Sequence, residues 1–285
     1  MNGTMVTIEN DALRVQISRE GAQLQSVFNR RAGRELLWQG DPAVWRKRAP
    51  WLFPIIGQLR GGVYRYAGRE YAMPMHGFAS EACFACAQQT ESSAAFELTD
   101  SPQTRAVFPW RFLLRIEYHL AGAALEMVCS VRCRDEKEMY FSFGAHPGFF
   151  CAPGDRLCFE GAPSLLCQRL NARTHLLEPQ TLEIPAEIEL REALFDADAM
   201  LLRAPACDQA VLRRADGTGV RFTFGRVPWV GVWSRPRGGL PYVCVEPWYG
   251  VDDPAGASGE LEEKRDIVRL GAGEVFTMPL RIEAI

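Results

Sequence analysis

Several features that would assign a chain to a class at sight are missing from this sequence of 285 residues. No apolar run approaches the ~20 residues that a membrane-spanning helix needs, and the start of the chain has no basic stretch followed by an apolar one, as a secretory signal has. Lys and Arg form no block, and the net charge is −3, which argues against a nucleic-acid surface. We therefore expect a cytoplasmic protein that binds neither membranes nor nucleic acid.

Familiar catalytic signatures are missing as well. The chain has no Gly-rich phosphate loop, no Ser elbow and no His-Glu-x-x-His motif, so nucleophilic Ser or Cys catalysis has no support. Nine cysteines are scattered along it and are interpreted as reduced core residues. Cys83 and Cys86 have CxxC spacing, but no second pair follows, and residues three apart in a strand point to opposite faces. We expect neither a metal site nor a cofactor.

Alternation of apolar and polar residues dominates what is present. It predicts strands around Val6–Ile8 and Leu13–Ile17, a hairpin over 112–133 that turns at 121–123, and a hairpin over 210–224 that turns at Asp216-Gly217. The best helical candidate, Glu260–Leu270, is short. There is no repeat of fixed period. The pattern predicts an all-β protein, a large sandwich in one domain over residues 1–285.

One apolar, β-branched run ends on a carboxylate, in Leu240-Pro-Tyr-Val-Cys-Val-Glu246-Pro-Trp-Tyr-Gly250. Because Pro cannot continue a central ladder and favours an extended residue before it, Glu246 is predicted at the end of a rigid strand. Desolvation among aromatic residues would raise the basicity of Glu246 and suit it to proton transfer. A Glu that simply points to solvent is the alternative for this residue taken alone.

Two of the four histidines have similar settings. His146 ends the apolar run that begins at Met139 and is followed by Pro147, and His76 is followed by Gly77, which allows a tight turn or a close approach of a ligand. His119 lies on the polar face of an alternating run and His175 in a polar stretch, so both are predicted at the surface.

The stretch from Trp45 to Gly62 is rich in Trp, Arg and Gly. It fits a ligand rim and a crossover loop that plugs one end of the sandwich equally well, and Arg60 is its strongest candidate for a functional residue.

In combination, these segments resemble the aldose 1-epimerase (mutarotase) family, particularly its LacX-like bacterial branch. The matching stretches run in the family's order over nearly the whole chain: Ala49–Gly57, His76–Ala79, His146-Pro147, Leu194–Met200, Cys244–Gly250, Glu263–Ile267 and Gly273–Phe276. The resemblance implies a β-supersandwich of the galactose mutarotase type with a small-molecule sugar as ligand. It implies Glu246 as general base, His146 as general acid, His76 as a substrate-binding residue and Asp198 as an acceptor for a sugar hydroxyl.

The residue types suit this chemistry. Ring opening takes a proton from the C1 hydroxyl and gives one to the ring oxygen, which a carboxylate and an imidazolium can do together. Ordinary pKa values of about 4.3 for Glu and 6.5 for His would place the required protonation state near pH 5 to 6, and a carboxylate close to His146 should raise its pKa. Trp248 and Phe149 are candidates to lie against the sugar, whereas Trp233 is predicted in the core.

Departures from the LacX-like pattern limit the substrate. Gln58 occupies a position where that pattern has Arg, and Arg60, two residues on, would substitute if both lay on one face of a strand. Ser80 replaces an Arg, so an unphosphorylated hexose or related aldose is favoured. Gly148-Phe149 follows His146-Pro147 where galactose mutarotases carry Asn and an aromatic residue, so galactose should not be assumed.

Other classes remain open. A non-catalytic carbohydrate-binding or sensing protein on the same scaffold is the main alternative to an isomerase of carbohydrate metabolism, and a polysaccharide lyase-like enzyme lacks an evident basic groove. The chain is expected to be a monomer or a homodimer.

Overall fold

The computed structural model describes residues 5–285, and β-strands dominate them. Most strands belong to three antiparallel sheets of nine, eight and four strands. The nine-stranded sheet runs β18 (Glu187–Glu189), β15 (Arg156–Cys158), β20 (Gln209–Arg213), β21 (Gly219–Thr223), β25 (Val275–Ala284), β11 (Ala124–Cys133), β10 (Phe112–Ala121), β9 (Ser93–Thr99) and β8 (Ala85–Gln89). The eight-stranded sheet runs β17 (Leu177–Ile184), β16 (Leu165–Leu170), β19 (Met200–Arg203), β22 (Trp229–Trp233), β23 (Tyr242–Tyr249), β13 (Phe143–Ala145) and β5 (Trp51–Leu52), with β14 (Gly148–Phe150) also paired to β23.

The smaller elements complete the chain. The four-stranded sheet holds β1 (Met5–Glu9), β2 (Leu13–Ser18), β3 (Leu24–Asn29) and β4 (Arg34–Glu35); β6 (Val63–Tyr66) pairs with β7 (Arg69–Ala72), and β12 (Met139–Phe141) with β24 (Val268–Leu270). The helical segments are α1 (Pro102–Val107) and the 3-10 turns η1 (Arg60–Gly62), η2 (Ala79–Glu81), η3 (Glu192–Phe195) and η4 (Leu261–Glu263). Among residues 5–285, none of these is a helix that could cross a membrane.

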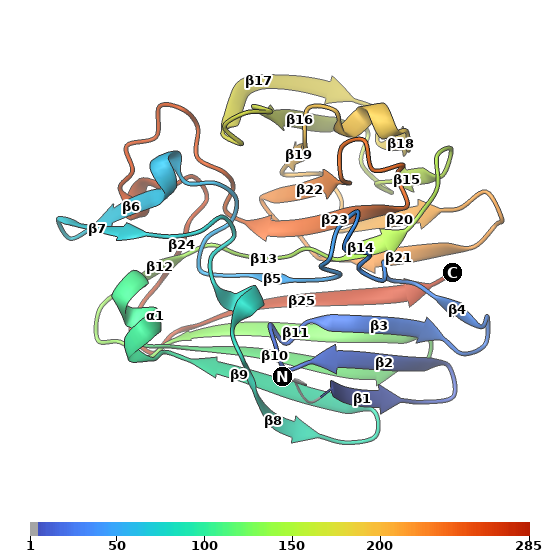
Figure 1. Cartoon of the computed structure of the whole chain (residues 1–285), viewed down its shortest axis with the longest axis horizontal. Helices are drawn as coiled ribbons and strands as arrows, with labels where there is room; N and C mark the ends of the chain where they lie inside the picture. The colour runs from blue at the N-terminus through green and yellow to red at the C-terminus, as the bar shows by residue number, and fades with distance from the viewer. Residues whose placement is uncertain (1–4) are drawn as a thin grey trace.

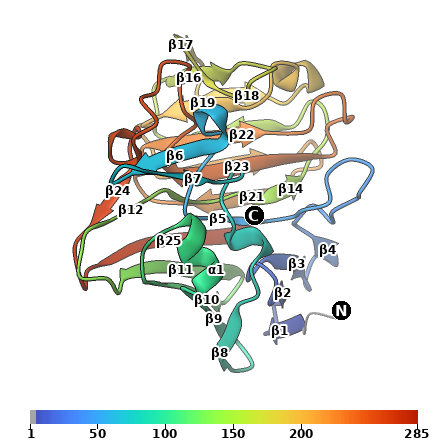
Figure 2. The ribbon, with the colours of Figure 1, turned by 60° about the vertical axis from the view of Figure 1, so that its left-hand side comes forward.

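The sheets form a two-layered sandwich. The nine-stranded sheet makes one layer, and the eight-stranded and four-stranded sheets lie against it as the other (Figures 1 and 2). Aromatic residues join the layers: Phe149 of β14 packs on Phe222 of β21 with ring centroids 5.7 Å apart, and Phe143 of β13 packs on Phe276 of β25 at 6.0 Å. The predicted β-sandwich is therefore confirmed, and its core lies between the layers.

The clearest sequence patterns became the expected strands. The β10–β11 hairpin pairs Phe112 with Cys133 at one end and Ala121 with Ala124 at the other. Along β10, alternate residues from Phe112 to Tyr118 are buried, because their side chains face the opposing layer. The hairpin of β20 and β21 and the pairing of β1 with β2 are confirmed as well.

The predicted helix over Glu260–Leu270 is wrong. The segment contains only the short turn η4, after which Val268–Leu270 forms β24 and pairs with β12. Two side chains of this segment contact distant residues and so keep its backbone out of a helical conformation. The Lys264 ammonium contacts Asp253, and the Asp266 carboxylate accepts a hydrogen bond from Trp229 Nε1 at 2.6 Å. These tertiary contacts outweigh a weak local helix propensity.

Candidate active site

Glu246 lies inside a strand rather than at its end. Contrary to the prediction, β23 continues through Pro247 to Tyr249. On one side of β23, β13 and β14 pair above and below this position and leave a gap between them. Val245 donates its N–H into that gap, to the carbonyl of Pro147 at 3.2 Å. The backbone nitrogen of Pro247, two residues after Val245, points to the same side of β23. Because that side faces the gap, the missing N–H of Pro247 costs no hydrogen bond between strands.

His146 occupies this gap. The strand β13 ends at Ala145 and β14 begins at Gly148, so His146 ends a strand as the sequence predicts. Its backbone N–H donates to the carbonyl of Pro50 at 3.0 Å, which fixes the backbone of the break. Because β23 lies alongside, the imidazole meets the Glu246 side chain directly.

The two side chains form a buried pair. His146 Nε2 lies 3.2 Å from Glu246 Oε2, and the side chains are only 11% and 2% exposed. Burial raises the pKa of Glu246 well above its ordinary value, and the nearby carboxylates of Asp252 and Asp198 add to this. Burial also lowers the pKa of His146 well below its ordinary value, and the neighbouring His76 adds to this, so the expected upward shift of the His146 pKa is wrong.

Both shifts favour the same protonation state. A pair with one proton, shared between carboxylate and imidazole, has no net charge, whereas a pair with none or two is charged in a site that excludes water. The one-proton state therefore extends to higher and lower pH than it would for the free side chains. This is the state that acid–base chemistry with one donor and one acceptor requires.

His76 faces the same space in a defined tautomer. It follows β7 in a turn with a φ of 64°, and its backbone N–H donates to the carbonyl of Gly57 at 3.2 Å. In return, the Gly57 N–H donates to His76 Nδ1 at 3.1 Å. Since Nδ1 accepts, the neutral ring carries its proton on Nε2. Burial lowers the pKa of His76 to about 4, which keeps it a neutral donor. Its ring centroid lies 5.8 Å from that of His146.

These groups line a cavity of about 700 Å³, a volume suited to a small ligand. The wall comes from loops and strands far apart in the sequence: Trp45, Lys47, Pro50, Leu52, Pro74, Met75, His76, Gly77, Ser80, Glu81, His146, Leu170, Ala172, His175, Asp196, Asp198, Ala199, Trp233, Arg235, Pro236, Glu246, Trp248 and Asp252. The two catalytic candidates and His76 thus share one hollow. His146 and Glu246, together with the adjacent Cys244, are also the groups that could hold a metal ion.

Three tryptophans line the cavity. Trp248 does so as predicted, and Trp233 also lies there, half-buried, instead of in the core. Trp45 stacks on the imidazole of His146 with ring centroids 5.0 Å apart and planes tilted by 27°. Indole faces of this kind suit the apolar C–H faces of a sugar. The sequence did not single out Trp45 as a cavity residue, because the aromatic residues of its long loop could equally well fill one end of the sandwich core.

Asp198 and His175 meet at the cavity. The Asp198 carboxylate contacts His175 Nδ1 at 2.6 Å, and both residues line the wall. The His175 side chain is 44% exposed, which agrees with the predicted surface position, but the sequence did not predict that it would also line the cavity. Both residues have positive φ values, 54° for His175 and 71° for Asp198, a strained backbone that is concentrated at functional sites.

Two predicted site residues lie elsewhere. Arg60 is exposed at the start of η1 and does not line the cavity. Arg60 could substitute for an Arg at position 58 only if this segment were a strand, but Gly57 has a φ of 67° and the chain turns there. Phe149 is 1% exposed and packs between the layers on Phe222. Gln58 also lies outside the cavity, and its side-chain amide donates to the carbonyl of Leu59 at 2.9 Å.

Lys47 is a cavity residue that the sequence did not single out. Its ammonium donates to the Ser80 hydroxyl at 2.8 Å and pairs with Glu81 at 2.5 Å. A cation therefore does stand beside Ser80, where the LacX-like pattern has Arg, but a carboxylate already neutralises it. The sequence could not show this contact, because Lys47 and Ser80 belong to separate loops that meet only in the folded protein.

Asp252 is a second unpredicted residue, and it is almost completely buried at 2% exposure. One of its oxygens accepts the N–H of Gln58 at 2.7 Å, while Oδ2 has no hydrogen-bond partner among residues 5–285. Burial raises the pKa of Asp252 to about 6. The carboxylate lies so close to Gly57 that a Cβ built there would be 2.1 Å from Oδ1, so this position requires glycine.

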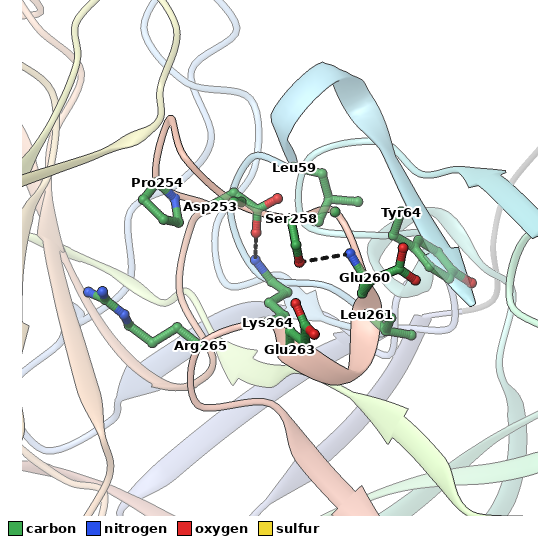
Figure 3. Close-up of a pocket in the computed structure, with 12 residues that line it drawn as sticks. Leu59, Tyr64, Asp253, Pro254, Ser258, Glu260, Leu261, Glu263, Lys264 and Arg265 are labelled. Atoms are coloured by element: carbon green, nitrogen blue, oxygen red, sulfur yellow. Dashed lines mark hydrogen bonds and ion pairs between the residues drawn. The ribbon is translucent and has the colours of Figure 1, made fainter. Parts of the chain in front are cut away.

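Lys264 clamps the turn that carries Asp252. Its ammonium is buried and donates to the carbonyl of Val251 at 2.6 Å and to Asp253 Oδ1 at 2.8 Å. The other oxygen of Asp253 accepts the N–H of Arg60 at 3.0 Å. Figure 3 shows Lys264 directed at Asp253 beside a smaller pocket of about 150 Å³. Lys264 thus holds the cavity wall from outside the cavity.

Comparisons with known proteins agree with this architecture. A family model described as aldose 1-epimerase matches residues 4–247. The chromosomal protein LacX of Lactococcus lactis is 30% identical over an alignment of 283 positions that covers 93% of this chain and 94% of that protein. A galactose mutarotase related enzyme from Lactobacillus acidophilus is 32% identical with a TM-score of 0.95, over 99% of this chain and 97% of that one. A galactose mutarotase-like protein from Lactobacillus casei is 27% identical with a TM-score of 0.94, over 99% and 100% of the two chains.

Proposed function

The chain belongs to the aldose 1-epimerase family, and we propose that it interconverts the α and β anomers of an unphosphorylated hexose or related aldose by acid–base ring opening. One observation carries the proposal: the 3.2 Å contact between His146 Nε2 and Glu246 Oε2, in a cavity large enough for a monosaccharide. The two oxygens that exchange protons in this reaction are bonded to the same carbon, C1. Two catalytic groups that serve them must therefore be neighbours, as these are.

The proposed steps use the pair's single proton, which burial favours on Glu246 and which moves to His146 before the ring opens. Glu246 takes the proton of the C1 hydroxyl while His146 gives its proton to the ring oxygen, and the C1–ring oxygen bond breaks. Rotation about the C1–C2 bond then presents the other face of the aldehyde. The reverse transfers close the ring and return the pair to its starting state, so the carboxylate–imidazole pair neither gains nor loses a proton over a cycle.

Other residues would hold the sugar. His76 presents an Nε2–H donor to a ring or hydroxyl oxygen, and Asp198 offers a carboxylate acceptor to a hydroxyl. The indole of Trp45, already stacked on His146, would lie next to the reacting end of the sugar. With the buried pair beneath it, the bound sugar would displace water and strengthen these hydrogen bonds.

The charge of the cavity supports an unphosphorylated substrate. Five carboxyl groups line it, against two cationic side chains, Lys47 and Arg235. Lys47 is already paired with Glu81. A phosphate group would therefore meet more negative than positive charge, whereas sugar hydroxyls find many acceptors.

The test is the rate of anomer exchange. Saturation-transfer NMR or polarimetry on freshly dissolved α-aldoses, in a buffer that does not itself catalyse, should show exchange faster than the spontaneous rate for at least one sugar of a broad panel. Glu246→Gln should lose about 10²- to 10⁴-fold of the catalysed rate, with sugar binding retained. Full activity in that variant, or sugar binding without acceleration in the unaltered protein, would favour the non-catalytic sugar-binding alternative.

A further inference from the structure

A thiol adjoins the buried catalytic pair. Cys244 and Glu246 are alternate residues of β23 and so point to the same face of the sheet. A ring nitrogen of His146, Sγ of Cys244 and a carboxylate oxygen of Glu246 all lie within 4.8 Å of one another, and all three residues are buried. Proton transfer at C1 uses the imidazole and the carboxylate, and it leaves the thiol without a role.

The spacing of these atoms is that of a metal site. Around a tetrahedral Zn²⁺ with bonds of about 2.0–2.1 Å to nitrogen and oxygen, two such ligands lie about 3.3 Å apart. The observed distance between His146 Nε2 and Glu246 Oε2 is 3.2 Å. With a Zn–S bond of about 2.3 Å, the sulfur must lie about 3.6 Å from the other two ligands. Cys244 Sγ, which lies within 4.8 Å of both atoms, would therefore have to move about 1 Å closer to them.

Charge and coordination fit as well. Imidazole, thiolate and carboxylate are ligands that zinc prefers, and the two anionic ligands cancel the charge of a dication in a site that excludes water. Apart from its contact with His146 Nε2, Glu246 Oε2 has no hydrogen-bond partner among the described residues, so the ion would displace that contact alone. His146 and Glu246 both line the cavity, which leaves the fourth position of the ion open to it.

We propose that His146, Cys244 and Glu246 form a binding site for a divalent cation of the zinc type, and that the bound ion inhibits the enzyme. The ion would enter through the sugar cavity, and two protons would be released to solvent as it binds, one from the Cys244 thiol and one from the His146–Glu246 pair. Since the metal occupies the lone pairs of both the general base and the general acid, neither can exchange protons with C1. The inhibitory half of this proposal depends on the proposed function, whereas the metal site does not.

Co²⁺ titration of the full chain tests the site without reference to activity. After treatment with a chelator and its removal, one equivalent of Co²⁺ should produce visible bands of tetrahedral intensity and a thiolate-to-metal charge-transfer band, and Zn²⁺ should displace both. Cys244→Ser should lose the charge-transfer band. Cys83→Ser, which alters an exposed cysteine, is the matched control and should keep it.

The outcomes separate clearly. No charge-transfer band at one equivalent, a band that survives in Cys244→Ser, or a band that disappears in Cys83→Ser would each overturn the metal site. If Cys244→Ser does not fold by circular dichroism, Cys244→Ala serves instead and should bind Zn²⁺ at least about tenfold more weakly.

Activity gives the second readout. If the protein accelerates anomer exchange, one equivalent of Zn²⁺ should abolish the acceleration and a chelator should restore it. Undiminished exchange in the zinc-loaded enzyme would overturn the inhibitory half. A protein with the cobalt spectrum but no epimerase activity would overturn the proposed function and leave the metal site standing.

Discussion

The backbone N–H of Gly57 donates a hydrogen bond to Nδ1 of His76. This contact fixes the neutral Nε2–H tautomer of His76, and burial holds the pKa of the ring at about 4. We therefore expect ¹⁵N NMR at pH 6 to show His76 neutral and protonated on Nε2. An imidazolium or an Nδ1–H tautomer for His76 at that pH would contradict the arrangement.

The function of that donor can be tested by substitution. His76→Ala should reduce kcat/KM about 10²-fold, as the loss of a positioned donor in a water-poor site does. His76→Gln, which keeps an N–H donor, should retain more activity than His76→Ala. Equal losses in the two variants would show that shape alone matters at this position.

The pH dependence of kcat/KM should be a broad plateau. Free Glu and His side chains hold one proton between them only from about pH 4.3 to 6.5. Burial raises the pKa of Glu246 and lowers that of His146, so the loss of the last proton moves to higher pH and the gain of a second one to lower pH. Neighbouring groups reinforce both shifts. Asp252 and Asp198 raise the pKa of Glu246 further, and His76 and Lys47 lower that of His146 further. Exchange rates extrapolated to zero buffer measure the profile, and a narrow bell with both limbs between pH 4.3 and 6.5 would refute the one-proton pair.

Lys264→Met should destabilise the fold strongly. The substitution leaves the Asp253 carboxylate buried without its cation, which costs about 3–5 kcal/mol in free energy of unfolding. Urea unfolding measures the loss, and Lys264→Met combined with Asp253→Asn should recover part of it. Arg269→Met is the control, because the pair of Arg269 with Glu138 is exposed and its removal should leave the urea midpoint unchanged. A Lys264→Met protein as stable as the control would show that the clamp contributes little.

Arg60 and Asp198 should behave differently as candidates for binding the sugar. Arg60→Gln should leave KM and kcat within about twofold, because the side chain lies outside the cavity. Asp198→Asn should lower kcat/KM about 10- to 100-fold, because a charged acceptor for a sugar hydroxyl is lost. A large effect of Arg60→Gln would mean that the loop from Gly57 to Gly62 closes over the sugar.

Local patterns predicted the strands and singled out the two residues of the buried acid–base candidate pair. The β10–β11 hairpin could be predicted because alternation and a tight turn are local signals. Glu246 and His146 stood out because each interrupts an apolar run and precedes a proline.

The remaining features depend on contacts between distant segments. The continuation of β23 through Pro247 depends on the gap between β13 and β14, which no single segment encodes. Asp252, Lys47 and Trp45 reach the cavity only because separate loops converge there. Arg60 was placed wrongly because the argument assumed a strand where the chain turns at Gly57.

The strand β25, Val275–Ala284, lies in the interior of the nine-stranded sheet, between β21 and β11. During synthesis, β11 and β21 leave the ribosome before β25, and without β25 between them they cannot become part of one sheet. Until residue 284 has emerged, the nascent chain therefore exposes two open sheet edges that could pair with other chains. A carboxy-terminal deletion that reaches into β25 should accordingly lower the yield of native protein far more than its length suggests.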